Sequence, residues 1–168
     1  MNEALEIGLR TAVEKRVKSI FTSKAQVNTS AAAYADLRNI LIAANTFREG
    51  EHLVYKGGGF VLCTGGNVTQ VDFRLRFGGI DVHLVGFAPG APGAFPWFME
   101  GIITQNSDIG GVFFWNNANF NVTRGELPGW PGPTADMNLQ LQAQIAVSAG
   151  TGIVANETWN VVKYPNAG

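Results

Sequence analysis

The stretch from Thr69 to Phe77 constrains the fold more than any other part of the sequence. Its side chains alternate strictly between apolar and polar, and the apolar ones are Val71, Phe73, Leu75 and Phe77. This period of two is typical of a half-buried antiparallel strand. Gly78-Gly79 follows, and a second alternating run begins at Ile80. The sequence therefore predicts a β-hairpin over residues 69–77 and 80–86, because glycine accepts the positive φ of a tight turn.

The rest of the chain after residue 36 can be interpreted as sheet built around this hairpin. Gly57-Gly58-Gly59 interrupts one long run and predicts a bulge or a bend. Turn signals recur at short intervals without a βαβ rhythm. We therefore expect an all-β, antiparallel, jelly-roll-like β-sandwich of about eight strands. The other expected strands are 37–42, 51–64, 97–105, 110–116, 136–147 and 157–164.

Residues 2–21 are the only strong helix candidate. An apolar residue recurs every four positions, and acidic groups precede basic ones, which complements the helix dipole. We expect a helix and linker arm over residues 1–36 and a β-sandwich domain over residues 37–168. The helix either packs on its own domain or docks on a partner. The candidate docking residues are Leu5, Leu9, Val13, Val17 and Phe21.

The composition favours burial against another subunit. Apolar residues make up 46% of the chain and charged residues only 15%, below the usual share of about 25%. The Pro/Gly loop at 87–96 is too apolar to be freely solvated, and a second Pro/Gly loop at 124–134 carries an aromatic residue. The run from Val112 to Trp115 is apolar on both faces. We expect a homo-oligomer whose subunit interface includes Phe87, Phe95, Phe113, Trp115 and Trp130.

Charge and targeting signals exclude several classes of partner. The net charge of −1 gives no bias toward nucleic acid or membranes. No run approaches the ~18 apolar residues of a membrane span, and no secretory leader is evident, so we expect cytoplasmic synthesis. The single cysteine, Cys63, lies in an apolar run and is expected to be a small buried hydrophobe.

The sequence offers little chemistry for catalysis. His83 and Asp81 are expected on one outward strand face, but a metal needs three or four ligands and no third is marked. No serine lies in a Gly-x-Ser-x-Gly motif. We expect no catalytic residue, metal or cofactor. Sugar binding by exposed tryptophans is the alternative that stays open, at Trp97, Trp115, Trp130 or Trp159.

Four segments together resemble a group of phage virion proteins with jelly-roll domains, which are capsid decoration (cement) proteins and fibre tips. The run from Ile40 to Glu51 is similar to their "I-P-A-N-T-L-x-x-G-D" entry, with Ala43 where proline is usual and Glu51 where aspartate is. Phe73–Gly79 is similar to their "x-L-R-F-G-G" hairpin. The other two segments are the strand that Trp97 leads and the run 136–144.

The resemblance covers residues 37–164 and implies a homotrimer without catalytic residues, mounted on a capsid or tail. The leading hypothesis is a capsid decoration protein on the virion surface. Its partners would be further copies of itself and the major capsid protein, reached by the arm, with no nucleic acid or membrane. The alternative is a fibre tip that binds a host receptor or a carbohydrate, and a hydrolase with an unrecognised carboxylate pair is a third hypothesis.

Overall fold

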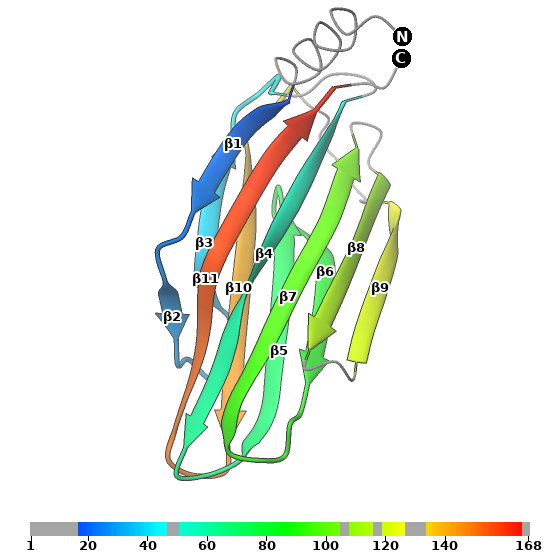
Figure 1. The fold of residues 1–168 in the computed structure, drawn as a ribbon. Coiled ribbons are helices and arrows are strands. Elements are labelled where there is room, and N and C mark those ends of the chain that lie inside the picture. The colour runs from blue at the N-terminus through cyan, green and yellow to red at the C-terminus, as the bar shows by residue number, and fades with distance from the viewer. Residues whose placement is uncertain (1–16, 47–50, 105–107, 116–118, 127–133, 166–168) are drawn as a thin grey trace, which may run out of the picture.

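The computed structural model describes residues 17–46, 51–104, 134–165 and, at the level of the backbone, 108–115 and 119–126. They form two antiparallel sheets packed face to face (Figure 1). Sheet A contains β1 (Lys18–Ser23), β2 (Val27–Thr29), β4 (His52–Thr64), β7 (Gly93–Thr104), β8 (Asp108–Trp115), β9 (Asn119–Glu126) and β11 (Thr151–Tyr164). Sheet B contains β3 (Ala35–Ile42), β5 (Val68–Phe77), β6 (Ile80–Phe87) and β10 (Met137–Val147).

The strand order defines the topology of the two sheets. Sheet A runs β1-β11-β4-β7-β8-β9, with β2 also paired to β11, and sheet B runs β3-β10-β5-β6. All strand pairs are antiparallel. The expected all-β sandwich of two antiparallel sheets is thus confirmed, with eleven strands among the described residues instead of about eight.

The predicted hairpin is confirmed as β5 and β6. Gly78 and Gly79 both have positive φ, 59° and 85°, as a two-residue turn between twisted strands requires. The four alternating apolar residues of β5 are fully buried. They face sheet A, and the Phe73 ring lies 4.6 Å from the Trp97 ring of β7. The core therefore lies between the hairpin and the central strands of sheet A.

The three glycines of β4 do not form the predicted bulge. The strand is continuous over Gly57-Gly58-Gly59, and the register shift lies opposite, in β11, between Asn156 and Thr158. The glycines are needed for close approach instead. A Cβ at Gly57 would lie 2.1 Å from the ring of Trp159, and one at Gly59 would lie 2.0 Å from the carbonyl oxygen of Ala155.

The N-terminal prediction needs a correction. Residues 1–16 lie outside the described part of the chain, but Lys18–Ser23 forms β1 and not the end of a helix. This segment pairs with β11, and Ile20 and Phe21 pack against the core. Backbone pairing with a strand far along the chain overrides a local four-residue period, because β-branched and aromatic side chains suit a sheet.

The predicted linker up to residue 36 is also partly sheet. Val27–Thr29 is β2, paired to β11, and β3 begins at Ala35, two residues before the expected start. Similarly, β7 begins at Gly93, inside the expected Pro/Gly loop. Among the described residues, β8 pairs with β7 only from Trp97 onward, so the described neighbour of Pro96 is β4, and proline is tolerated where a strand has one neighbour.

Candidate functional site

The two histidines do not form a metal or catalytic site with the described residues. β6 shifts its register against β5 between Leu75 and Arg76, so His83 turns inward and is 1% exposed. The prediction that it shares an outward face with Asp81 is therefore wrong. Asp81 instead accepts a hydrogen bond from Arg76, 3.0 Å away. Burial lowers the pKa of His83, and neither ring nitrogen has a hydrogen-bond partner within the described chain. No group of three potential metal ligands occurs in the part of the chain that the structure describes.

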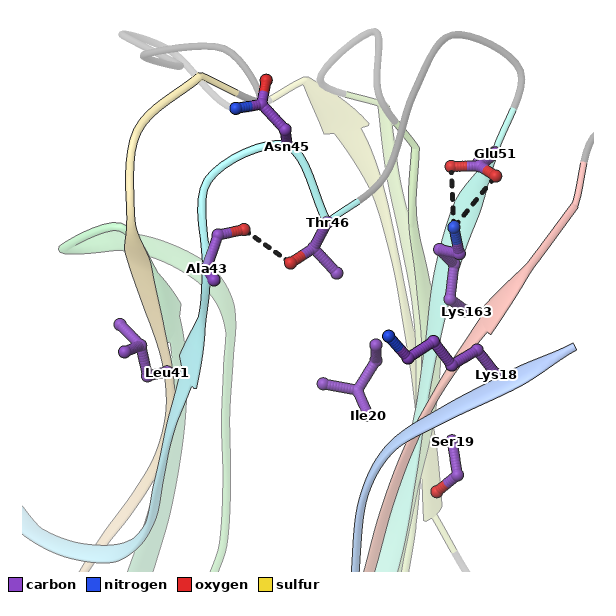
Figure 2. A pocket seen from close by; sticks show the side chains of 9 residues that line it. All are labelled: Lys18, Ser19, Ile20, Leu41, Ala43, Asn45, Thr46, Glu51 and Lys163. Atoms are coloured by element: carbon purple, nitrogen blue, oxygen red, sulfur yellow. Dashed lines mark hydrogen bonds and ion pairs between the residues drawn. The ribbon is translucent and has the colours of Figure 1, made fainter.

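A cleft of about 590 Å³ opens at one end of the sandwich, between the edges of the two sheets (Figure 2). Leu41 of β3 and Ile20 of β1 lie on opposite sides of it. The turn after β3 also lines it, through Ala43, Asn45 and Thr46. Asn45 has φ 59°, a conformation that asparagine adopts more readily than most residues, and Thr46 donates two hydrogen bonds to the carbonyl oxygen of Ala43. The cleft is thus lined in part by the end of β3 and the turn after it, and in part by β1 and β11.

The polar groups of this cleft include a partly buried ion pair. Lys163 donates to both carboxylate oxygens of Glu51, at 3.0 and 3.2 Å, and each side chain is about one-fifth exposed. Lys18 and Ser19 complete the described polar lining. The described lining contains no histidine or cysteine that could act as a base or a nucleophile.

The most distinctive surface is the outer face of sheet A, which faces the viewer in Figure 1 with no other described element over it. Along β4, β7 and β11 the residues between the core positions are themselves mostly apolar. We call this surface the apolar face. It consists of half-buried or exposed Val54, Phe60, Leu62, Phe98, Ile102, Ile153 and Val162.

The strand register places these side chains in rows. Ile153 pairs with Leu62, and Val162 pairs with Val54, which pairs with Ile102. Ile102 is 43% exposed, a high value for an isoleucine within a sheet. Exposed apolar patches of this kind mark interaction surfaces when they are contiguous. At one end of the apolar face, the Tyr164 ring stacks on the His52 ring at 5.4 Å.

Few charges interrupt the apolar face. Lys56 and Glu100 form one exposed ion pair at 3.8 Å near its middle, and the Lys56 ammonium lies 5.4 Å from the Phe98 ring centroid. Glu157 is exposed at the bulge of β11. Along the β1 side, Thr22 donates a hydrogen bond to Asn160. Most protein interfaces have an apolar centre and a polar border, whereas this surface carries an ion pair near its middle.

The outer face of sheet B is mostly polar, apart from exposed Leu41 on β3 and Leu84 on β6, and we call it the polar face. Arg74 donates to Gln142, which in turn donates to Asp36, at 2.8 and 2.6 Å. Gln144 donates to Asp72 at 2.8 Å. The Arg74 guanidinium lies over the Tyr34 ring, 4.1 Å from its centroid. These groups fix one another across β3, β10 and β5, so the amide-rich outer side of β10 is a hydrogen-bonded network and not a row of free side chains.

The structure places several of the predicted interaction residues against the core. Phe87 is 7% exposed and lies in the core, and Phe95 packs half-buried against the same core. Phe21 packs on the core as well, while Val17 is half-buried. The described side chains do not include those of Leu5, Leu9, Val13, Phe113, Trp115 and Trp130.

The tryptophans expected as sugar platforms are also largely internal. Trp97 is 3% exposed and donates its indole N–H to the carbonyl oxygen of Ala155, and Trp159 is 1% exposed. Stacking on a sugar by these two rings is therefore excluded. The apolar face was missed because its residues sit beside core residues in pairs such as Val161-Val162 and Ile102-Ile103. Such pairs remove the period of two and are a signal of sheet covered on both faces.

The comparisons with known proteins show the fold. No protein-family model matches the chain, and no curated protein matches it. Among solved structures, a seed lectin of Lotus tetragonolobus is similar, with a TM-score of 0.51 and 7% identity over 88% of this chain and 91% of the lectin. The CBM2 module of the evolved Dit of Lactobacillus casei BL23 phage J-1 gives a TM-score of 0.49 and 7% identity, over 91% and 98% of the two chains. At this identity, the lectin establishes a lectin-like β-sandwich and nothing about ligands.

Proposed function

We propose that the chain is a non-enzymatic structural protein of a bacteriophage particle, a capsid decoration protein that binds the major capsid shell as a homotrimer. The observation that carries the proposal is the apolar face. A sandwich with an apolar face on one sheet gains free energy when protein covers that face, by about 25 cal/mol for each Å² of apolar surface removed from water. The resemblance of residues 37–164 to virion jelly-roll proteins is the reason for proposing a bacteriophage particle as the assembly.

The attachment site of the proposal now lies before β1. Leu5, Leu9, Val13 and Val17 remain its candidate contacts with the capsid, whereas Phe21 is occupied by the core. Since β1 and β2 belong to sheet A, deletion of residues up to 24 would damage the sandwich. Deletion of residues 1–16 leaves every described strand in place and is the sharper variant.

The experiment compares full-length protein with the chain lacking residues 1–16 on purified phage capsids. Cosedimentation measures binding, and electron microscopy of gold-labelled protein locates it on the particle. We expect the full chain to bind the capsid surface and the truncated chain to lose that binding while keeping its unfolding midpoint. Full-affinity binding by the truncated chain would remove the arm as anchor. Gold found only on tails would remove the decoration role itself.

A second candidate function is saccharide binding by a fibre tip, and the polar face favours it. Planar amide, carboxylate and guanidinium groups beside an aromatic ring suit hydroxyl-rich ligands, which both donate and accept hydrogen bonds. A glycan array with the wild type, Tyr34→Ala and Gln142→Ala tests it. The control is Thr69→Ala, an exposed change on β5. Binding that both variants lose and the control keeps would favour this function.

A further inference from the structure

We infer that the apolar face is the surface on which copies of this chain pack on one another. The inference rests on the assembly role proposed above but requires no contact with a capsid. A face that packs on its own copy joins two chains, so this contact is separate from the one that closes the proposed trimer. It differs from the interface expected in the Pro/Gly loops, because it places the contact on the centre of sheet A, on β4, β7 and β11.

The size of the apolar face is in the range that a stable contact needs. Between the rows of Leu62 and His52 it extends over ten residues of β4, or about 33 Å. The three strands occupy about 14 Å across, which gives a flat projection of about 460 Å². Accessible surface exceeds a flat projection, because side chains stand out from the sheet. A standard interface buries about 800 Å² on each partner, so this part of sheet A, with the Lys56–Glu100 pair included, corresponds by flat projection to a little over half of one.

The charge pattern favours a second copy over an unrelated partner. Lys56 and Glu100 are neighbours across β4 and β7, and their side chains are 57% and 46% exposed. A facing copy presents the same pair, so each ammonium can approach the carboxylate of the other chain. A surface with one sign of charge would instead leave one of the two groups opposed by a like charge. The apolar residues around this pair are best covered by another apolar surface. The apolar face of a second copy provides one.

The first test measures molar mass by light scattering and sedimentation for three proteins. These are the wild type, Ile102→Glu in the apolar face, and Leu84→Glu. Leu84 is a matched control, because it is 58% exposed on β6 of the opposite sheet. We expect an oligomer for the wild type and for Leu84→Glu. We expect Ile102→Glu to raise the dissociation concentration by about 100-fold or more, since it would bury an unpaired carboxylate.

A second test uses charge-reversal variants and applies even if Ile102→Glu fails to fold. Chains with Lys56→Glu carry two acidic groups at the centre of the apolar face, and chains with Glu100→Lys carry two basic groups. Each variant alone should assemble more weakly than the wild type by about tenfold or more, because like charges face each other. Mixing the two should restore assembly as mixed oligomers, and added salt should weaken the restored contact.

The outcomes separate this inference from the proposed function. A monomeric wild type at micromolar concentration overturns the inference, and so does an Ile102→Glu protein that stays fully assembled. If Ile102→Glu remains assembled but no longer binds capsids, the apolar face docks on the capsid and the decoration role stands without the inference. If the wild type assembles through this face but binds no particle, the inference stands and the decoration role fails.

Discussion

At the scale of single residues, the two sheets are joined by a polar contact inside the core. Arg38 of β3 points inward and donates its Nε–H to the Oδ1 atom of Asn156, at 2.6 Å. Asn156 is fully buried and donates to the carbonyl oxygens of Gly58 and Thr158, at 3.2 and 3.0 Å. Arg38 also donates to the carbonyl oxygen of Ala25. This cluster holds the bulge of β11 in place and ties sheet B to the segment between β1 and β2.

Replacement of Asn156 by alanine should therefore destabilise the protein by about 2–4 kcal/mol. The change leaves a buried guanidinium and two backbone carbonyls with fewer partners, and each unsatisfied buried group costs about 1–3 kcal/mol. Chemical denaturation measures the loss. Asn160→Ala is the matched control, because Asn160 is only half-buried and bonds a surface threonine. An equal loss in both variants would contradict the role of the cluster.

His83 makes stability depend on pH. Its pKa is lowered by burial in the folded state, so the folded chain excludes a proton that the unfolded chain binds below about pH 6.5. The stability that depends on neutral His83 is complete above that pH and is lost as the pH falls toward the folded pKa. The loss should approach about 1.4 kcal/mol per pH unit.

Denaturation curves between pH 7.5 and pH 5 test this prediction. His83→Phe should flatten the dependence, since phenylalanine has no proton to gain. His52→Gln should retain it, because the pH-sensitive group is His83. A dependence unchanged in His83→Phe would assign the effect to other groups.

At the scale of elements, the centre of β4 requires glycine, because neighbouring groups leave no room for a Cβ atom there. Gly57→Ala would push a methyl group into the fully buried Trp159 ring, which has no room to retreat. Overpacking of this kind typically costs about 1–3 kcal/mol. Thermal unfolding measures it, and Lys56→Ala, an exposed change one residue away, should change stability by less than about 0.5 kcal/mol.

The first two strands are part of the sandwich, and truncation measures this. A chain starting at residue 17 should unfold at the same denaturant concentration as the full chain. A chain starting at residue 31 loses β1 and β2, and with them Ile20, Phe21 and Val27 from the edge of the core. Full burial of an apolar side chain is worth about 1.5–3 kcal/mol, and these three are half-buried, so the second truncation should cost about 2–4 kcal/mol. Equal stability of both truncated chains would show that β1 and β2 are dispensable.

The elements show how far sequence patterns reach. β5, β6 and β10 were predictable because one face of each is buried and the other is exposed to solvent. Apolar and polar residues therefore alternate along each strand. β1 was not predictable, since its pairing with β11 joins segments more than 130 residues apart. β9 was missed because only two apolar residues, Phe120 and Val122, alternate before Arg124 ends the pattern. The inward turn of His83 follows from a register shift that local sequence does not encode.

The candidate site was less predictable than the fold, for a physical reason. A strand with apolar residues on both faces shows no alternation between apolar and polar side chains, so the sequence cannot say which of Val161 and Val162 faces the core. Their assignment requires the sheet partners. Conversely, Phe87 and Trp97 looked like surface aromatics because proline and glycine surround them in the sequence, yet the ends of β6 and β7 carry them inward.

At the scale of the whole molecule, self-association through the apolar face and self-association through the polar face should respond to salt in opposite ways. Assembly through an apolar face should strengthen in sodium sulfate, because this salt is excluded from protein surface and favours burial. We expect the dissociation concentration of the wild type to fall as sulfate rises from zero to about 0.5 M, by light scattering. Weaker assembly in sulfate would indicate a contact dominated by ion pairs, which salt screens.

The buried thiol of Cys63 has a practical consequence. It is the only cysteine in the chain, it is 2% exposed, and it donates a hydrogen bond to the carbonyl oxygen of Gly66. The native protein should thus react only slowly with thiol-reactive dyes. A cysteine introduced at residue 102 or at residue 84 would be the one site that labels quickly. Comparing the two labelling rates in free protein and on intact particles would map which sheet is covered in each state.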